Sequence, residues 1–221
     1  MESKPGIYDN ILVFDFKSLY PSIMRTFNLD PLSFLGKKKE KNAIKAPNDV
    51  YFRNENGIIP EIIQILWEER DKAKKEKNEL SSYAIKILMN SMFGIMASPS
   101  CRFFNMDFAN AITTFCQYII KFTAKKIEEL GYEVIYEDTD SAFINSDAKS
   151  EDEAEKIGKE IEIYINKFYK DYIKKEYNRE SFLELEFEKN YIRFLMPKIR
   201  SGEKGAKKRY AGLKKIGDKE N

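Results

Sequence analysis

Three aspartates occur where apolar side chains or a simple turn would be expected. Asp15 is the one charged residue in the apolar run ILVFDF, and Asp138 and Asp140 lie at the centre of the segment EVIYEDTDSAFI. A buried carboxylate costs free energy unless it is paired or binds a metal ion. The chain has no histidine. Two carboxylates that converge at strand ends would therefore form an all-oxygen site of the kind that Mg²⁺ prefers.

Each aspartate also has an ordinary structural explanation. Asp15 could bond a neighbouring backbone N–H at a strand end, and the DTD triplet could be a simple turn. Taken singly, the residues favour these explanations. Strand pairing can nevertheless bring Asp15 and Asp140 together, although 125 positions separate them in the sequence. Two Mg²⁺ ions held there could clamp the attacking and leaving oxygens of a phosphoryl displacement.

The aspartates must be positioned by strands, and three segments have strand patterns. Residues 11–16 are a nearly continuous apolar run, which is typical of a buried strand. Residues 132–144 predict two strands around a tight turn. Residues 183–188 (LELEFE) alternate strictly, so that their three glutamates would share one face. The patterns predict a mostly antiparallel sheet that carries Asp15 and Asp140.

Helical patterns occupy much of the remaining chain. One helix begins at Pro60, where the missing N–H costs nothing, and a second is capped by Ser81 or Ser82. A short connection between the two forms an α-hairpin. Longer helices are predicted at residues 108–130 and at residues 151–177, the latter as one helix or a pair. The predicted fold class is α+β, with an antiparallel sheet backed by helices.

The hairpin helices carry cations at helical spacing. Arg70 and Lys74 are four positions apart, and Lys86, Asn90 and Phe93 follow the spacing i, i+4 and i+7, so each set lies on one helix face. Facing helices with these side chains would form a cationic wall for a polyphosphate, with Asn90 as a neutral donor. A solvated helix face is the alternative, and the spacing alone favours it.

Composition excludes several classes of protein. Without histidine, histidine-based triads and histidine metal sites are excluded, and Cys101 and Cys116 lack CxxC spacing. No apolar run approaches the roughly 20 residues of a membrane span, so the chain is predicted to be cytoplasmic, nucleoid-associated in a prokaryote, and without a membrane partner. The net charge is only +2. Basic residues gather between Lys198 and Lys215, as a phosphate-binding face or as a solvated surface.

Four motifs occur in a fixed order along the chain: DFKSLYPSI at 15–23, KILMNSMFG at 86–94, YEDTDS at 136–141 and KKRY at 207–210. This order resembles the family B DNA polymerases, whose palm and fingers carry DxxSLYPS, KxxxNSxYG, YGDTDS and KKxY. The resemblance covers essentially the whole chain and is strongest to the bacterial repair-type branch. It implies a palm at residues 1–57 and 98–221, with two-helix fingers inserted at residues 58–97.

The resemblance also implies the reaction and the residues that serve it. A primer 3′-hydroxyl would attack the α-phosphate of a dNTP and release pyrophosphate, so primer–template DNA and dNTP would be the partners. Asp15 and Asp140 would hold two Mg²⁺ ions, Asp138 would be a third and more structural carboxylate of the catalytic group, and Lys86 would donate a proton to pyrophosphate. Nucleotide binding would fall to Ser18, Leu19, Tyr20, Arg70, Lys74, Lys86, Asn90 and Phe93, and DNA binding to Lys207, Lys208, Arg209 and Tyr210.

Some of these implied roles have a direct physical reason. The backbone N–H groups of Ser18 and Leu19 would be left unpaired where the strand ends, and so could donate to the triphosphate. Tyr20 would stack under the sugar and exclude a 2′-hydroxyl; a tyrosine that fills the core is the alternative, and both roles are compatible. Glu186 or Glu188 would lie near the metal ions, and the sequence does not choose between them.

The chain departs from the family pattern in three ways. Glu137 replaces the glycine of YGDTDS, and Phe93 replaces the tyrosine of NSxYG, which retains the ring and loses the hydroxyl. Met1 lies only 14 residues before Asp15, and the chain ends 11 residues after Tyr210. The N-terminal, exonuclease and thumb domains of the family are therefore expected to be absent, and a second chain could supply the thumb or the exonuclease.

Three other functions are alternatives to a catalytic DNA polymerase core. A non-catalytic DNA-binding subunit, or a partner-dependent fragment of a split polymerase, would retain the fold; intact Asp15, Asp140, Lys86 and Arg70 argue against loss of catalysis. An RNA-dependent polymerase would differ in template and sugar preference. A calcium-binding module is excluded because the EF-hand spacing of Asp, Gly and Glu is missing around Asp138.

Overall fold

The computed structural model describes residues 3–199, 202 and 204–214, so Arg200 and Lys215 of the basic segment lie outside the described residues. The chain separates into two compact units. The sheet unit comprises Met1–Lys17, Ile119–Phe168 and Glu184–Asn221, and the helical unit comprises Ser18–Tyr118 and Tyr169–Leu183. The two long helices α4 (Met106–Glu129) and α5 (Glu151–Tyr177) contribute residues to both units.

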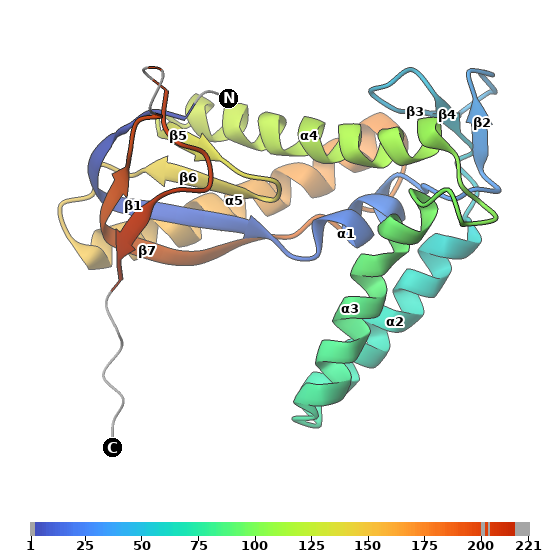
Figure 1. Ribbon diagram of the computed structural model, residues 1–221, viewed down its shortest axis with the longest axis horizontal. Coiled ribbons are helices and arrows are strands. Elements are labelled where there is room, and N and C mark those ends of the chain that lie inside the picture. Colours follow the sequence, from blue (N-terminus) through green and yellow to red (C-terminus); the bar gives the residue numbers. More distant parts are fainter. Residues whose placement is uncertain (1–2, 200–201, 203, 215–221) are drawn as a thin grey trace. The chain divides into compact units, whose positions relative to one another are not determined.

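The sheet unit contains a five-stranded sheet in the order β5-β6-β1-β7-β8. Its strands pair antiparallel, as the sequence predicted. In Figure 1, β7 runs alongside β1. The bounds are Gly6–Phe16 for β1, Glu133–Glu137 for β5, Ser141–Asn145 for β6, Leu185–Met196 for β7 and Ala211–Leu213 for β8. Both β1 and β7 are longer than the patterns that predicted them. The first residues of β1 are mostly exposed or only partly buried, and the outer part of β7 includes buried Phe194 and Met196 but does not alternate strictly.

The central strand β1 is buried on both faces of the sheet. Val13 belongs to a cluster with Phe143 and Phe194 on one face. On the other face, the ring of Phe14 lies 5.5 Å from that of Phe187, which packs against α5. A Cβ atom at Gly158 of α5 would come within 2.8 Å of the Phe187 ring. Glycine at this position therefore permits the close approach of helix and strand.

The helical unit is built around a pair of helices. Helices α2 (Ile58–Lys75) and α3 (Glu79–Met96) lie side by side and form the predicted hairpin (Figure 1). The short helix α1 (Leu19–Thr26) follows β1 along the chain. A small sheet in the order β2-β4-β3 was not predicted, because its strands Phe34–Gly36, Ile44–Lys45 and Tyr51–Phe52 are too short to show periodicity.

Several predicted helix ends are wrong by a few residues. The cap of α3 is Asn78, whose side-chain oxygen accepts the Ser81 N–H at 3.0 Å, so neither Ser81 nor Ser82 is the cap. Asparagine competes well for this position because its short side chain reaches the first free N–H groups. Helix α2 starts at Ile58, ahead of Pro60. Residues 151–177 form one helix. Within the described part of the chain, no helix has the length and apolarity to cross a membrane.

Candidate active site

Antiparallel pairing brings two of the three aspartates together, as predicted. Asp15 at the end of β1 lies opposite Ser141 of β6, and the Phe16 N–H donates to the Asp140 carbonyl at 2.9 Å. On its other side, Asp15 lies opposite Glu186 of β7. Asp15 and Asp140 are both half-buried. The end of this sheet therefore concentrates carboxylates around Asp15.

The crowding changes the acidity of both aspartates. Burial, followed by the charges of Asp140, Glu188 and Glu186, raises the pKa of Asp15 to about 7. Burial also raises the pKa of Asp140, and the charges of Asp138 and Glu188 act in the same direction. Removal from water and repulsion between like charges both disfavour the ionised form. A cation at this end of the sheet would relieve both effects.

The donor set fits Mg²⁺, which the family implies. Among the described residues, no group of three or more Asp, Glu, Cys or His is arranged to hold a metal ion alone. Mg²⁺ is commonly held by only one or two carboxylates, with water and substrate phosphates as the other ligands. Asp15 and Asp140, whose pKa values are raised by burial and by neighbouring carboxylates, meet this requirement.

A β-bulge separates the two nearby glutamates. Between Val13 and Phe14 the register of β1 with β7 shifts, which leaves Glu188 as the extra residue on β7. Bulges interrupt strand pairing and re-aim side chains, yet burial alternates over residues 183–188 as expected, and Glu184, Glu186 and Glu188 are all exposed. Glu186 lies 3.7 Å from the Lys17 ammonium, and Glu188 accepts from Lys189 at 2.8 Å.

Asp138 has different partners from the other two aspartates. Its carboxylate oxygens lie 2.7 and 2.9 Å from Nζ of Lys208, and one of them accepts the Thr139 N–H at 2.8 Å. Burial opposes ionisation, but these hydrogen bonds outweigh it and lower the pKa of Asp138. The sequence had grouped Asp138 with the catalytic residues as a more structural member, and the geometry of an ion pair suits that structural role.

The KKRY segment packs onto the β5–β6 hairpin. The Lys208 N–H donates to the Tyr136 hydroxyl at 3.0 Å, and Lys208 adopts a left-handed backbone with φ of 60°. The Tyr210 ring lies 5.0 Å from Phe143 and 5.2 Å from Phe194. Lys207 and Arg209 are exposed beside these anchored residues. The sequence analysis did not predict the hydrogen bond between Lys208 and the Tyr136 hydroxyl, because the two residues are remote in the chain.

In the helical unit, Ser18 and Leu19 lie at the start of α1. Ser18 is its N-cap, with a left-handed backbone of φ 46° and ψ 57°. The Leu19 N–H therefore belongs to the first turn of a helix, where N–H groups have no intrahelical acceptor. The sequence had attributed the unpaired N–H groups to the end of a strand, whereas the structure places them at the start of a helix. An Nη atom of Arg70 lies 3.5 Å from the Ser18 hydroxyl oxygen, so a residue of the DFKSLYPSI motif meets a cation of helix α2 here.

A pocket of about 430 Å³, named here the cationic pocket, is lined by both helices of the hairpin. It brings together three predicted cations, Arg70, Lys74 and Lys86. The same pocket is lined by four residues that the sequence analysis did not assign to nucleotide binding: Lys77, Glu79, Ser82 and Tyr83. The i, i+4 spacing of Ser82 and Lys86 was a usable signal for one of them. The Arg70 Nε is buried without a hydrogen-bond partner among the described residues.

The remaining predicted nucleotide contacts lie at the other end of α3. The rings of Tyr20 and Phe93 are 4.8 Å apart at an angle of 38°. Asn90 is exposed and is not among the residues that line the cationic pocket.

The departure at Glu137 from the family pattern is explained in part. Glu137 is absent from the positions with positive φ, so the backbone here does not require glycine.

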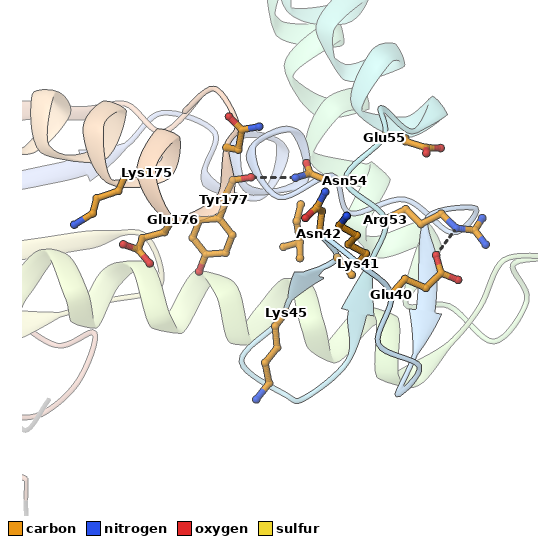
Figure 2. A pocket seen from close by; sticks show the side chains of 13 residues that line it. Glu40, Lys41, Asn42, Lys45, Arg53, Asn54, Glu55, Lys175, Glu176 and Tyr177 are labelled. Carbon is orange, nitrogen blue, oxygen red and sulfur yellow. Dashed lines mark hydrogen bonds and ion pairs between the residues drawn. The ribbon is translucent and has the colours of Figure 1, made fainter.

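A larger pocket of about 750 Å³ lies away from all predicted site residues. Figure 2 shows that it is lined by the segment around β3 and by the end of α5, where the Asn54 amide donates to the Tyr177 carbonyl at 3.0 Å. Arg53 pairs with Glu40 at 3.3 Å in the same wall. Its acidic and basic side chains alternate without converging on one point. It is therefore a weaker candidate than the carboxylate cluster.

Comparison with known proteins identifies the family. The family model for DNA polymerase family B matches residues 1–221. The chain is 42% identical to DNA polymerase II of Escherichia coli over 100% of its own length and 28% of the relative. It is 32% identical to a DNA polymerase of Thermococcus gorgonarius, over 75% of the chain and 23% of the relative.

A solved structure agrees with the sequence relatives. The family B DNA polymerase of the archaeon Pyrobaculum calidifontis matches with a TM-score of 0.66 and 28% identity, over 97% of this chain and 27% of that one. The chain thus spans about a quarter of the length of these relatives. On the match of the family model to the whole sequence, the chain belongs to DNA polymerase family B.

Proposed function

We propose that the chain is the core of a DNA-directed DNA polymerase that transfers a nucleotide from a dNTP to a primer 3′-hydroxyl and releases pyrophosphate. The observation that carries this proposal is the pairing of Asp15 with Ser141, the residue after Asp140, which brings two carboxylates with raised pKa values to one end of the sheet. Family membership supports the choice of a nucleotide substrate. The proposed palm is residues 1–57 and 98–221, and the proposed fingers are residues 58–97.

Asp15 and Asp140 are the proposed ligands of two Mg²⁺ ions. When bound, such ions would act as Lewis acids that stabilise charge on the phosphoryl oxygens and lower the pKa of the primer hydroxyl. Glu186 and Glu188 add negative charge around Asp15. Asp138 is already neutralised by Lys208. It therefore serves to hold the hairpin and the KKRY segment instead of binding a metal ion.

Arg70, Lys74 and Lys86 are the proposed contacts of the triphosphate. They line one pocket from two helices, and phosphoryl transfer is catalysed largely by positioning and charge stabilisation. The Nε of Arg70, which has no hydrogen-bond partner within the described part of the chain, offers a further donor. Lys86 is the proposed proton donor to pyrophosphate as the bond to the α-phosphate breaks. The amides at the start of α1 and Asn90 add neutral donors.

Tyr20 and Phe93 are proposed to form the floor for the sugar and the new base pair. Their rings already pack together, so Tyr20 has limited freedom to move away from a 2′-hydroxyl. Lys207, Lys208, Arg209 and Tyr210 are the proposed contacts of the primer–template duplex. Contacts to the backbone position DNA without reading sequence. A DNA substrate also implies a location with the chromosome, in the cytoplasm of a prokaryote.

Primer extension by purified protein tests this function. The chain is assayed with a labelled primer–template, dNTPs and Mg²⁺, both alone and mixed with the remaining regions of a relative. Asp15→Ala should abolish extension, because the first metal ligand is lost. Asp49→Asn, an exposed carboxylate in a turn of the helical unit, is the matched control and should extend normally.

Two outcomes would count against the proposal. Extension by Asp15→Ala at the wild-type rate would contradict the metal assignment. DNA binding without extension under every condition would favour a non-catalytic subunit. Mn²⁺ binding to the chain without DNA, followed by electron paramagnetic resonance, gives a second readout that does not depend on turnover.

A further inference from the structure

Two buried polar residues hold the start of helix α2 from a distant segment. Asn28 and Asp30 follow helix α1, and their exposed fractions are 0% and 1%. Asn28 has a left-handed backbone with φ of 53°. Buried polar side chains are costly unless their hydrogen bonds are satisfied. Neither residue was assigned a role by the sequence motifs, so their burial calls for an explanation.

Asp30 supplies the cap that α2 lacks. The N-cap residue is Gly57, which has no side chain to cap the helix. One carboxylate oxygen of Asp30 accepts the Ile59 N–H at 2.7 Å, and the other accepts the Leu32 N–H at 2.7 Å. A negative charge is stabilised at a helix N-terminus, where free N–H groups point outward. Asp30 therefore links its own loop to the first turn of α2.

Asn28 fixes the chain that enters the same helix. Its side-chain oxygen accepts the Gly57 N–H at 2.8 Å, and its amide nitrogen donates to the carbonyls of Arg53, at 2.7 Å, and Glu55. Gly57 fits closely against Asp30, since a Cβ atom there would lie 2.4 Å from the Asp30 Cβ. The three residues Asn28, Asp30 and Gly57 are named here the α2 anchor.

The opposite side of the same connection is also held. Arg179 donates to the carbonyl of Asn54 at 2.8 Å and to that of Thr26 at 2.8 Å. The Asn54 amide in turn donates to the Tyr177 carbonyl, as Figure 2 shows. The segment before α2 is thus bonded on both sides, and its direction into the helix is determined by side chains of remote residues.

A tilt of helix α2 at the α2 anchor would displace residues further along the helix. Arg70 lies 11 residues after Ile59 on the same helix, a distance of about 17 Å at the α-helical rise. A tilt of about 10° at the anchor would therefore move the Arg70 backbone by about 3 Å. Such a displacement exceeds the tolerance of a hydrogen bond. Small changes at the anchor would misplace Arg70 and Lys74 in the cationic pocket.

We propose that Asn28 and Asp30 are positioning residues that set the direction of α2 and thereby the geometry with which Arg70 and Lys74 meet the triphosphate. This inference rests on the proposed function of the pocket as a nucleotide site. Without the anchor, α2 would have to be ordered when the nucleotide binds, so the cost of ordering would appear in the nucleotide affinity. Affinity for primer–template through the sheet unit would not depend on the anchor.

The chain contains its own reporter for this test. Trp67 is the only tryptophan in the sequence, it lies on α2 one turn before Arg70, and the Arg25 guanidinium lies 5.4 Å from its ring centre. Its fluorescence is titrated with dNTP in the presence of primer–template, while circular dichroism reports the melting temperature. Asp30→Asn retains one acceptor and loses the other, Asp30→Ala loses both, and Gly57→Ala disturbs the contact from the helix side.

The expected result is a graded loss of nucleotide affinity. The loss of one hydrogen bond should weaken dNTP binding about fivefold in Asp30→Asn, with a larger loss in Asp30→Ala and a similar loss in Gly57→Ala. Affinity for primer–template should be unchanged. Asp49→Asn makes the same chemical change at an exposed turn of the same unit and should bind dNTP like the wild type.

Other outcomes separate the two proposals. If the variants melt at lower temperature and yet bind dNTP with wild-type affinity, the anchor is only structural and the inference is wrong. If the wild-type chain gives no saturable dNTP response, the proposed function of the pocket fails. In that case the emission spectrum of Trp67 is compared without nucleotide. If all three variants have the wild-type spectrum, the anchor does not direct α2 and the inference is overturned.

Discussion

The Lys208 ammonium forms an ion pair with both carboxylate oxygens of Asp138, at 2.7 and 2.9 Å, while the Lys208 N–H donates to the Tyr136 hydroxyl. One residue of the KKRY motif is therefore bonded twice to the YEDTDS hairpin. Two sequence motifs that lie 70 residues apart act as one structural element. The pairing presents the neighbouring basic side chains on a fixed backbone.

Lys208→Ala is expected to weaken primer–template binding more than it weakens the fold. The Lys208 side chain is 69% exposed, and exposed ion pairs contribute at most about 1 kcal/mol to stability. The variant loses one positive charge beside the proposed DNA site and leaves the Asp138 charge unpaired, so the slope of log affinity against log salt should fall by about one. Fluorescence anisotropy with labelled DNA at several salt concentrations measures both effects. Lys175→Ala, at an exposed position in the helical unit, is the control; an equal slope in both variants would contradict the assignment.

Asp15→Asn is expected to stabilise the metal-free chain at neutral and alkaline pH. The folded pKa of Asp15 is about 7 and its ordinary value is 3.8, so the folded chain holds this proton more tightly than the unfolded chain. The contribution of Asp15 to stability is therefore fully present below pH 4 and is lost as pH rises through 7. Asparagine does not ionise, so Asp15→Asn should avoid about 2 kcal/mol of this loss of folding stability, after allowance for solvent screening.

Urea unfolding with EDTA, compared at pH 5 and pH 8, measures this difference. The wild-type chain should lose stability relative to Asp15→Asn between the two pH values. Asp9→Asn is the control. The hydrogen bond with Arg193 lowers the pKa of Asp9, so the ionised Asp9 carboxylate should still stabilise the wild-type chain at pH 8. Parallel pH profiles for wild type and Asp15→Asn would show that the pKa of Asp15 is not raised in the folded chain.

Tyr20→Ala is expected to admit ribonucleotides. The Tyr20 ring is held 4.8 Å from Phe93, so its removal would leave space where a 2′-hydroxyl could fit. Discrimination between dNTP and rNTP should fall by about tenfold or more, measured as the ratio of kcat/KM in single-nucleotide extension. Tyr20→Phe retains the ring and should retain the discrimination. Loss of discrimination in Tyr20→Phe as well would assign the effect to the hydroxyl.

Gly158→Ala is expected to destabilise the sheet unit. The new methyl group would lie 2.8 Å from the Phe187 ring, and overpacking of this kind costs about 1–3 kcal/mol. This outweighs the gain of up to about 1 kcal/mol when alanine replaces glycine in a helix. Gly94→Ala meets nothing within 4 Å and should show only the gain. Chemical unfolding compares the two; stabilisation by Gly158→Ala would mean that α5 can move away from β7.

Local patterns were sufficient for the larger elements. The apolar run around Asp15 predicted β1, and the segment around Asp138 and Asp140 predicted the hairpin. The i, i+4 spacing of Arg70 and Lys74 predicted that one helix face carries cations. The antiparallel pairing of β1 and β6 and the helical hairpin are confirmed. The hairpin and the separate strands follow from side-chain periodicity within about twenty residues, which the sequence displays directly. The pairing of β1 with β6 joins segments that are remote in the chain.

Competition between nearby residues was not decided by the sequence. Asn78 caps α3 although serines three and four positions later were equally suitable by type. The three short strands of the small sheet carry no periodic signal because they contain two or three residues each. The bulge at Glu188 depends on how β7 fits β1, since one extra residue is accommodated only where the register of both strands is known.

By itself, the sequence determined which residues are candidates for polymerase chemistry, because their types, order and spacing are properties of the chain. Only the tertiary structure decided how that chemistry is tuned. The raised pKa of Asp15, the neutralisation of Asp138 by Lys208 and the capping of α2 by Asp30 each join residues from separate segments. Their energies depend on distances across the fold, which no local pattern of side chains contains.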